Sequence, residues 1–204
     1  MTHIRQRWRS VALDNPTFWI YIPFYRPSWV PEMTKRSKFA TLKIDLNSRS
    51  FFHSRLSAVR EFLAVHLSRI QSIQLYKPVP RNLSLQGLFQ DLPAHSARCL
   101  ERLNLGLCLV YPQDSNPMAL IERLLDSPPR LRRLRMRCAV DWGSKILTDL
   151  TRLTLYHEGG TVTKSPPTHS EFLDALARMP VLRKLHLHKV PLPSPPTERI
   201  IEYY

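Results

Sequence analysis

The stretch Leu100-Glu-Arg-Leu103-Asn-Leu105 determines the fold that we expect for this chain. Leucines stand at its first, fourth and sixth positions, in the pattern L-x-x-L-x-L, and the last two leucines are two residues apart. A spacing of two places side chains on one face of a β-strand. We therefore predict a short strand here, with Leu103 and Leu105 on its buried face.

The same apolar pattern recurs along most of the chain. Close copies begin at positions 131, 150 and 182, and looser copies begin at Phe39 and Ile70. The intervals between successive starts (39, 70, 100, 131, 150, 182) are 31, 30, 31, 19 and 32 residues. Near-equal intervals indicate a repeat, and we interpret the short one as a unit that lacks its helix. The strand residues predicted to be buried are Leu103, Leu105, Leu134, Met136, Leu153, Leu155, Leu185 and Leu187.

The segments that precede four of the strands carry apolar residues at helical spacing. Two of these segments end in proline-containing turns, which stop a helix and leave the next residues extended. The residues that carry the helical spacing are Leu56, Val59, Leu63, Val65 to Leu67, Leu85, Leu88, Phe89, Leu92, Met118, Ile121, Leu124, Leu125, Phe172, Leu173, Leu176 and Ala177. A unit of helix, turn and strand cannot bury its apolar face alone, so stacked copies must share one core.

These repeats resemble the leucine-rich repeat in its longer form, over about residues 39–190. The resemblance implies an α/β solenoid, with parallel strands on the concave side and helices on the convex side, over residues 39–204. The Asn or Cys that usually follows the strand in this family is not a regular position here. An ordinary doubly wound α/β domain also alternates strands and helices. The near-constant spacing and the lack of a glycine-rich phosphate loop favour the solenoid.

The first 24 residues differ from the repeats and precede a connector at residues 25–38 that is rich in proline and aromatic residues. They resemble the C-terminal part of an F-box, which commonly reads Cys-Arg-Arg-Trp-Arg, then a small residue, then Pro-x-Leu-Trp. The matching residues are Gln6, Arg7, Trp8, Arg9, Ala12, Pro16, Phe18 and Trp19. An amphipathic cap for the solenoid would also need an aromatic helix here. We expect Trp8 and Trp19 to pack together against the first repeat.

An F-box followed by leucine-rich repeats implies a substrate-recognition subunit of a Skp-cullin-F-box ubiquitin ligase, of the kind abundant in fungi. Such a subunit performs no chemistry and positions a partner protein for ubiquitin-dependent degradation. The opening Leu-Pro-x-Glu segment of the family, which contacts the Skp-type adaptor, has no counterpart before Met1. We therefore expect adaptor binding only if an upstream F-box segment exists.

The charge balance favours acidic partners. The chain has 30 Lys and Arg against 16 Asp and Glu, a net charge of +14. The first prediction is an acidic protein segment, and the alternative is a basic repeat protein that binds nucleic acid or another polyanion through its concave face. The N-terminus has no apolar run long enough for a signal peptide, and three cysteines without CxxC spacing fit a reducing compartment. We expect an intracellular protein, cytoplasmic or nuclear, that does not bind membranes.

We expect neither catalysis nor a cofactor. The chain contains no G-x-S-x-G elbow, P-loop or H-E-x-x-H motif. His186 and His188, two apart on a predicted strand, would face the same way as metal ligands do, but no third ligand is evident nearby. We therefore interpret both histidines as part of an exposed surface.

Alternation along the strands identifies the candidate binding residues. If the strand leucines point inward, the residues between them lie on the concave face. Two positions beyond each start stand Thr41, Ser72, Arg102, Arg133, Arg152 and Lys184, and Arg135, Arg137, Tyr76, Tyr156, His186 and His188 lie further along the strands. Charged strand faces also serve solubility alone. Stacked like charges repel, however, and that repulsion favours an acidic partner.

Overall fold

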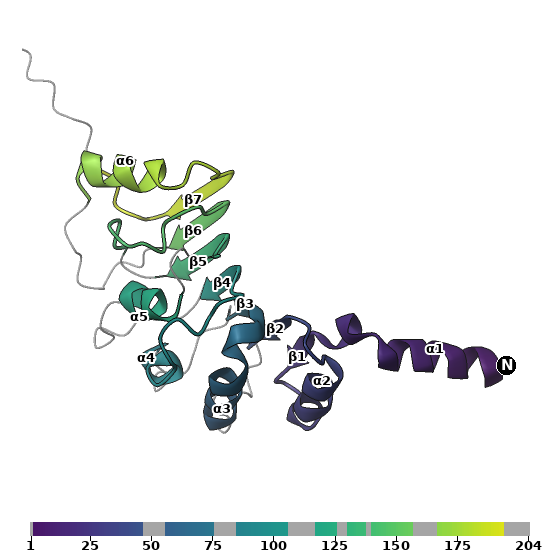
Figure 1. Ribbon diagram of the computed structural model, residues 1–204. Coiled ribbons are helices and arrows are strands. Elements are labelled where there is room, and N and C mark those ends of the chain that lie inside the picture. The colour runs from purple at the N-terminus through teal and green to yellow at the C-terminus, as the bar shows by residue number, and fades with distance from the viewer. Residues whose placement is uncertain are drawn as a thin grey trace, which may run out of the picture.

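The computed structural model describes residues 2–46, 56–75, 85–105, 117–125, 130–137, 140–156 and 167–193. Within these residues the chain forms one seven-stranded sheet, in which every strand is parallel to its neighbours and the strands follow chain order (Figure 1). The strands are β1 (Tyr21–Pro23), β2 (Leu42–Asp45), β3 (Ile70–Gln74), β4 (Arg102–Leu105), β5 (Arg133–Arg137), β6 (Arg152–Tyr156) and β7 (Lys184–His188).

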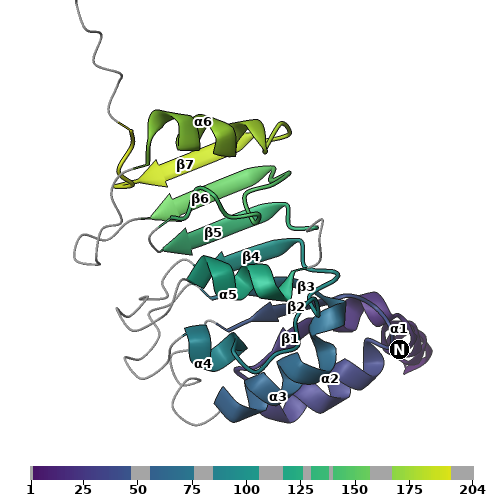
Figure 2. The ribbon, with the colours of Figure 1, turned by 60° about the vertical axis from the view of Figure 1, so that its left-hand side comes forward.

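Helices cover one face of this sheet. The α-helices are α1 (Thr2–Asp14), α2 (Val30–Arg36), α3 (Leu56–His66), α4 (Leu85–Phe89), α5 (Pro117–Leu124) and α6 (His169–Ala177), and short 3-10 helices are η1 (Pro16–Trp19), η2 (Pro27–Trp29) and η3 (Leu67–Arg69). Helices α2 to α6 lie on the same side of the strands, whereas α1 projects away from the β1 end of the sheet (Figures 1 and 2). We call the other side of the sheet, which carries the residues between the buried strand leucines, the open face.

The core lies between the strands and helices α2 to α6. In β4, Leu103 and Leu105 are buried, while Arg102 and Asn104 on the other face are half-buried. The prediction of buried strand residues is confirmed for Leu103, Leu105, Leu134, Met136, Leu153 and Leu155. Helix residues such as Met118, Ile121 and Leu124 belong to the same core. The period-two pattern therefore identified the inward side of β4, β5 and β6.

The prediction was wrong for the last strand. Leu185 is 37% exposed, and Leu187 is only half-buried. In β5 and β6 the equivalent residues have a strand on each side, whereas β7 pairs only with β6 among the described strands. Leu185 therefore lacks a neighbouring unit, in the described part of the chain, that would cover its outer side.

The short interval in the repeat corresponds to a unit without a helix in the part that the structure describes. Residues 140–151, which lead into β6, form turns and bends. Trp142, Ile146 and Leu147 are buried there. The ring of Trp142 meets that of Phe172 in α6 edge to face at 5.0 Å. A compact apolar turn therefore replaces a helix in the core.

Several apolar positions face solvent, contrary to the repeat pattern. Phe39 is 96% exposed, because Leu42, and not Phe39, is the register partner of Ile70, the start of the next copy. Val65 is exposed in α3, while Leu67 in η3 is buried. Leu173 and Ala177 are exposed because α6 turns Ala175 toward the core instead. The pattern thus placed these helices correctly but not every buried residue on them.

The N-terminal segment also differs from expectation. The sheet begins at Tyr21, before residue 39, because β1 pairs with β2, and α2 lies in the proline-rich connector. Trp8 does not pack against Trp19: α1 projects from the sheet, and Trp8 is 69% exposed. The indole Nε1 of Trp19 donates to the Ala12 carbonyl at 2.8 Å, and the Arg36 guanidinium lies 4.6 Å from its ring.

None of the helices in the described ranges combines the length and the apolar character that crossing a bilayer requires.

Candidate functional site

The strand register assembles a line of cations on the open face. Arg102 of β4 is the Cα partner of Arg133 in β5, Arg133 pairs with Arg152 in β6, and Arg152 pairs with Lys184 in β7. Parallel strands lie about 4.8 Å apart, so successive Cα atoms in this line are separated by about that distance. We call Arg102, Arg133, Arg152 and Lys184 the cation row.

The cation row continues toward the N-terminus with different residues from those expected. Arg102 pairs with Ser72, which is buried, and Ser72 pairs with Lys43. Thr41, predicted for this position, lies before β2, because Ile44, and not Leu42, is the register partner of Ile73. Lys43 therefore replaces Thr41, and its Nζ lies 4.9 Å from the Tyr21 ring centroid. The proposed contact at Tyr76 falls outside the described residues.

No acid among the described residues forms an ion pair with the cation row. Within the ranges that the structure describes, the side chains of Arg102, Arg133, Arg152 and Lys184 form no ion pair and no hydrogen bond. The ion pairs in those ranges, Arg36 with Glu32 and Arg60 with Asp91, lie elsewhere. Like charges on adjacent strands repel. The row therefore carries a repulsion that a bound anion would relieve.

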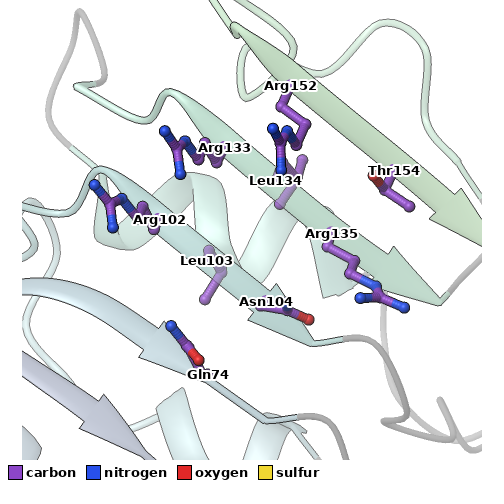
Figure 3. A pocket seen from close by; sticks show the side chains of 9 residues that line it. All are labelled: Gln74, Arg102, Leu103, Asn104, Arg133, Leu134, Arg135, Arg152 and Thr154. Carbon is purple, nitrogen blue, oxygen red and sulfur yellow. The ribbon is translucent and has the colours of Figure 1, made fainter. Parts of the chain in front are cut away.

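A hollow lies beside the cation row, over β3 to β6. Its volume is about 250 Å³, and its lining consists of Gln74, Arg102, Leu103, Asn104, Arg133, Leu134, Arg135, Arg152 and Thr154. Figure 3 shows the guanidinium groups of Arg102, Arg133 and Arg152 on one side of this hollow and that of Arg135 on the other. The short polar side chains of Asn104 and Thr154 lie on the strands on either side of Arg135, in register with it (Figure 3). The site can thus offer cations and neutral hydrogen-bonding groups together.

A second hollow, of about 540 Å³, opens at the amino ends of the same strands. Its lining residues are Glu101, Arg102, Arg132, Arg133, Thr151, Arg152, Arg183 and Lys184. Sequence reasoning missed Arg132 and Arg183, although each directly precedes a predicted strand cation and so extends the same charged patch. The carboxylate of Glu101 accepts a hydrogen bond from Gln71 at 3.0 Å. This part of the surface is strongly cationic with one carboxylate at its edge.

Aromatic rings border the other side of the open face. The register partners further along β5, β6 and β7 are Arg137, Tyr156 and His188. We call these three residues the ring row, after the rings of Tyr156 and His188. The rings of Tyr156 and His188 are 5.7 Å apart. Arg135 donates a hydrogen bond to the Tyr156 hydroxyl at 2.8 Å, and its guanidinium lies 5.0 Å from the ring centroid. These contacts hold Arg135 toward the ring row and away from the cation row.

The two histidines of β7 do not belong to a metal centre in the described residues. His186 and His188 are exposed on the open face, in register with Thr154 and Tyr156. Among the residues that the structure describes, no three His, Cys, Asp or Glu side chains are grouped so that they could hold an ion.

Of the residues that resemble an F-box, the structure brings Trp19 against Ala12 and leaves Trp8 exposed. Trp8 and Arg9 are exposed on α1. Pro16 begins η1 after the N-cap Asn15, and Trp19 lies against Ala12 and Arg36. Comparisons with family models, curated proteins and solved structures gave no match for this chain. Function must therefore be inferred from the open face itself.

Proposed function

We propose that this chain is a leucine-rich-repeat protein without catalytic activity, which binds an acidic segment of a partner protein through the open face. The observation that carries the proposal is the cation row, in which four strands in succession present a cation at the same register, none of them ion-paired within the described part of the chain. The sequential parallel sheet with helices on one face is consistent with the repeat assignment. An extended open face of this kind is what repeat proteins use for binding.

A protein segment fits the surface better than a nucleic-acid strand. Asp45 lies on the open face in register with Gln74, and the Glu101 carboxylate borders the cationic hollow. A continuous phosphate backbone would meet these carboxylates, whereas a peptide can place acids only where cations stand. Gln74, Asn104 and Thr154 also provide the neutral groups that hydrogen-bond peptide amides.

The F-box resemblance suggests a biological setting for this binding. We propose that the chain descends from, or acts as, the substrate-recognition subunit of a Skp-cullin-F-box ubiquitin ligase. The exposed Trp8 on the projecting helix α1 would then be available to the adaptor. Copurification of a Skp-type adaptor with the full-length gene product, lost on Trp8→Ala, supports this setting; no copurification would leave only the binding role.

The binding role is tested by charge reversal. We expect Arg133→Glu with Arg152→Glu to weaken binding of poly-glutamate by about tenfold or more, because two attractions of about 0.2–1 kcal/mol each become repulsions. The melting temperature should stay nearly unchanged, since Arg133 and Arg152 are exposed. Fluorescence anisotropy at fixed ionic strength and a thermal melt supply the two measurements.

A matched control has the same net charge. Arg98→Glu with Lys145→Glu changes two exposed cations in segments between the strands, outside the open face. This control should bind poly-glutamate much as the wild type does, apart from a small general charge effect. Equal weakening by both double variants would show that binding follows net charge alone. Tighter binding of single-stranded DNA than of poly-glutamate, with a steep salt dependence, would support the nucleic-acid alternative.

A further inference from the structure

We infer that the acidic segment binds as an α-helix that lies across β4 to β7, with its acids one helical turn apart facing the cation row. This inference rests on the proposed function and adds the conformation and spacing of the partner. Three features of the open face carry it: the pitch of the cation row, the distance between the cation row and the ring row, and the hollow beside the cation row.

The pitch of the cation row matches a helix. Strands repeat about every 4.8 Å, so the four cations span about 14 Å from Arg102 to Lys184. In an α-helix, which rises about 1.5 Å per residue, acids at positions i, i+3, i+7 and i+10 lie at about 0, 4.5, 10.5 and 15 Å. Each acid then falls within about 1 Å of the level of one cation.

The side-chain spacing of an extended segment does not match the spacing of the cation row. Side chains on one face of an extended chain are about 6.6 Å apart, so four acids span about 20 Å. That span exceeds the cation row by about 6 Å, and the fourth acid would pass beyond Lys184 on β7, the last strand among the described residues. An extended segment can therefore match about three of the four cations at once.

The width of the open face also suits a helix. The cation row and the ring row are four residues apart on β6 and β7, from Arg152 to Tyr156 and from Lys184 to His188. Four residues of strand measure about 13 Å, and a helix with its side chains is about 10–12 Å across. The register line between the rows consists of Asn104, Arg135, Thr154 and His186. Arg135 is the longest of these side chains, and its hydrogen bond to Tyr156 draws it toward the ring row.

The ring row defines what the flank of the helix should carry. Arg135 is held against Tyr156 by a hydrogen bond of 2.8 Å, and the Tyr156 and His188 rings are neighbours at 5.7 Å. These groups present ring surface beside the hollow. A helix with apolar or aromatic residues next to its acidic face would pack on them. The expected partner is thus an amphipathic acidic helix and not a uniformly acidic tail.

Two peptides of equal length and identical composition test the inference. One carries four glutamates at i, i+3, i+7 and i+10 on a helix-forming background, and the other carries them at i, i+2, i+4 and i+6. We expect the helically spaced peptide to bind the wild-type chain about tenfold more tightly, by anisotropy at physiological salt. Its circular dichroism should show more helix on binding. A proline in its centre should remove the advantage.

The outcomes separate this inference from the proposed function. If both peptides bind equally to the wild type and to Arg133→Glu with Arg152→Glu, the open face is not the binding site and both proposals fail. If the alternating peptide binds the wild type as tightly as the helical one, or the proline has no effect, the partner is extended. The helix inference then fails, while the cation row remains the binding site.

Discussion

Arginine has two different roles in this chain. Arg69, Arg123 and Arg178 donate to backbone carbonyls that lie about thirty residues away in sequence, in the neighbouring units. Those carbonyls are Ala40, Phe89, Gln90, Trp142 and Gly143. Such hydrogen bonds give partners to backbone carbonyls that lie outside the strands, and they link one repeat unit to the next. The cation row has no such contacts in the described residues, which is why we assign binding to it.

The buried strand leucines provide a stability test. Leu134 is 1% exposed, whereas Leu185, at the equivalent register position, is 37% exposed. We expect Leu134→Ala to lower the free energy of unfolding by about 2–5 kcal/mol, since it removes apolar contacts and leaves a cavity. Leu185→Ala should cost much less, below about 1 kcal/mol, because part of its surface is already in water. Urea unfolding measures both; equal losses would contradict the burial difference.

Individual residues also show which features of burial and exposure could not be predicted from the sequence. Alternation placed Leu134 inward and Arg133 outward, because a strand has only two faces. It could not show that Leu185 lies on the last described strand, since burial depends on the neighbour and not on the residue itself. It likewise could not show that Trp8 stays exposed, because that exposure depends on the direction in which α1 projects from the sheet.

Helix α6 has the best-defined start among the described elements. The Thr168 side chain accepts from the Glu171 backbone N–H at 3.2 Å, and the Thr168 backbone N–H donates to the Glu171 carboxylate at 2.8 Å. This reciprocal capping box satisfies two groups that a helix start leaves without partners. We expect Thr168→Ala to destabilise the chain by about 1 kcal/mol, measured by urea unfolding at pH 7. Ser170→Ala, one residue inside the helix, is the control and should cost less.

The same capping box makes stability depend on pH. The hydrogen bond from the Thr168 backbone, followed by that from its side chain, lowers the pKa of Glu171 below its ordinary value of 4.5. Since the folded pKa is the lower one, this contribution is present above pH 4.5 and is lost as the pH falls through the folded pKa. The stability difference between wild type and Glu171→Gln, which removes the carboxylate that accepts both hydrogen bonds, should therefore narrow below about pH 4.5. A difference that is constant down to pH 3 would contradict the assignment.

The elements differ in how far the sequence predicts them. Strands β2 to β7 follow from the apolar template, and helices α3 to α6 follow from the helical spacing before them. Strand β1 was missed because only Ile22 of its three residues is buried and Pro23 ends it. Helix α2 was missed because Pro31 and Trp29 suggested a connector, although proline is well suited to the first turn of a helix.

In the described sheet each strand hydrogen-bonds only to the strands before and after it, so stability should vary along the sheet. Strand β5 has buried residues on its inner face and a partner on each side, whereas β7 has no fully buried residue. Repeat stacks of this kind lose structure most easily at their ends. We expect the amides of β7 to exchange with deuterium faster than those of β5, by mass spectrometry. Slower exchange in β7 would show that it is covered by something in solution.

The arrangement of the whole sheet was predictable to a large extent, because equal spacing requires similar units to stack in order. The binding surface was predictable only in part. The cation row was predictable, because the apolar template sets the alignment of the strands and so brings its four residues into register. The contact between Arg135 and Tyr156 was not predictable, since it depends on side-chain conformations across two strands.

The unit between β5 and β6, which has a compact turn in place of a helix, affects the curvature of the molecule. Helices are about 10 Å wide and strands are about 4.8 Å apart, so a stack with helices on one side bends toward its strands. Where the outer layer is thinner, the bend is gentler. We therefore expect the turn around Trp142 to make the bend gentler beside Arg133 and Arg152 than beside strands backed by a helix. A straight, rigid rod can contact consecutive strands only where the arc is this shallow.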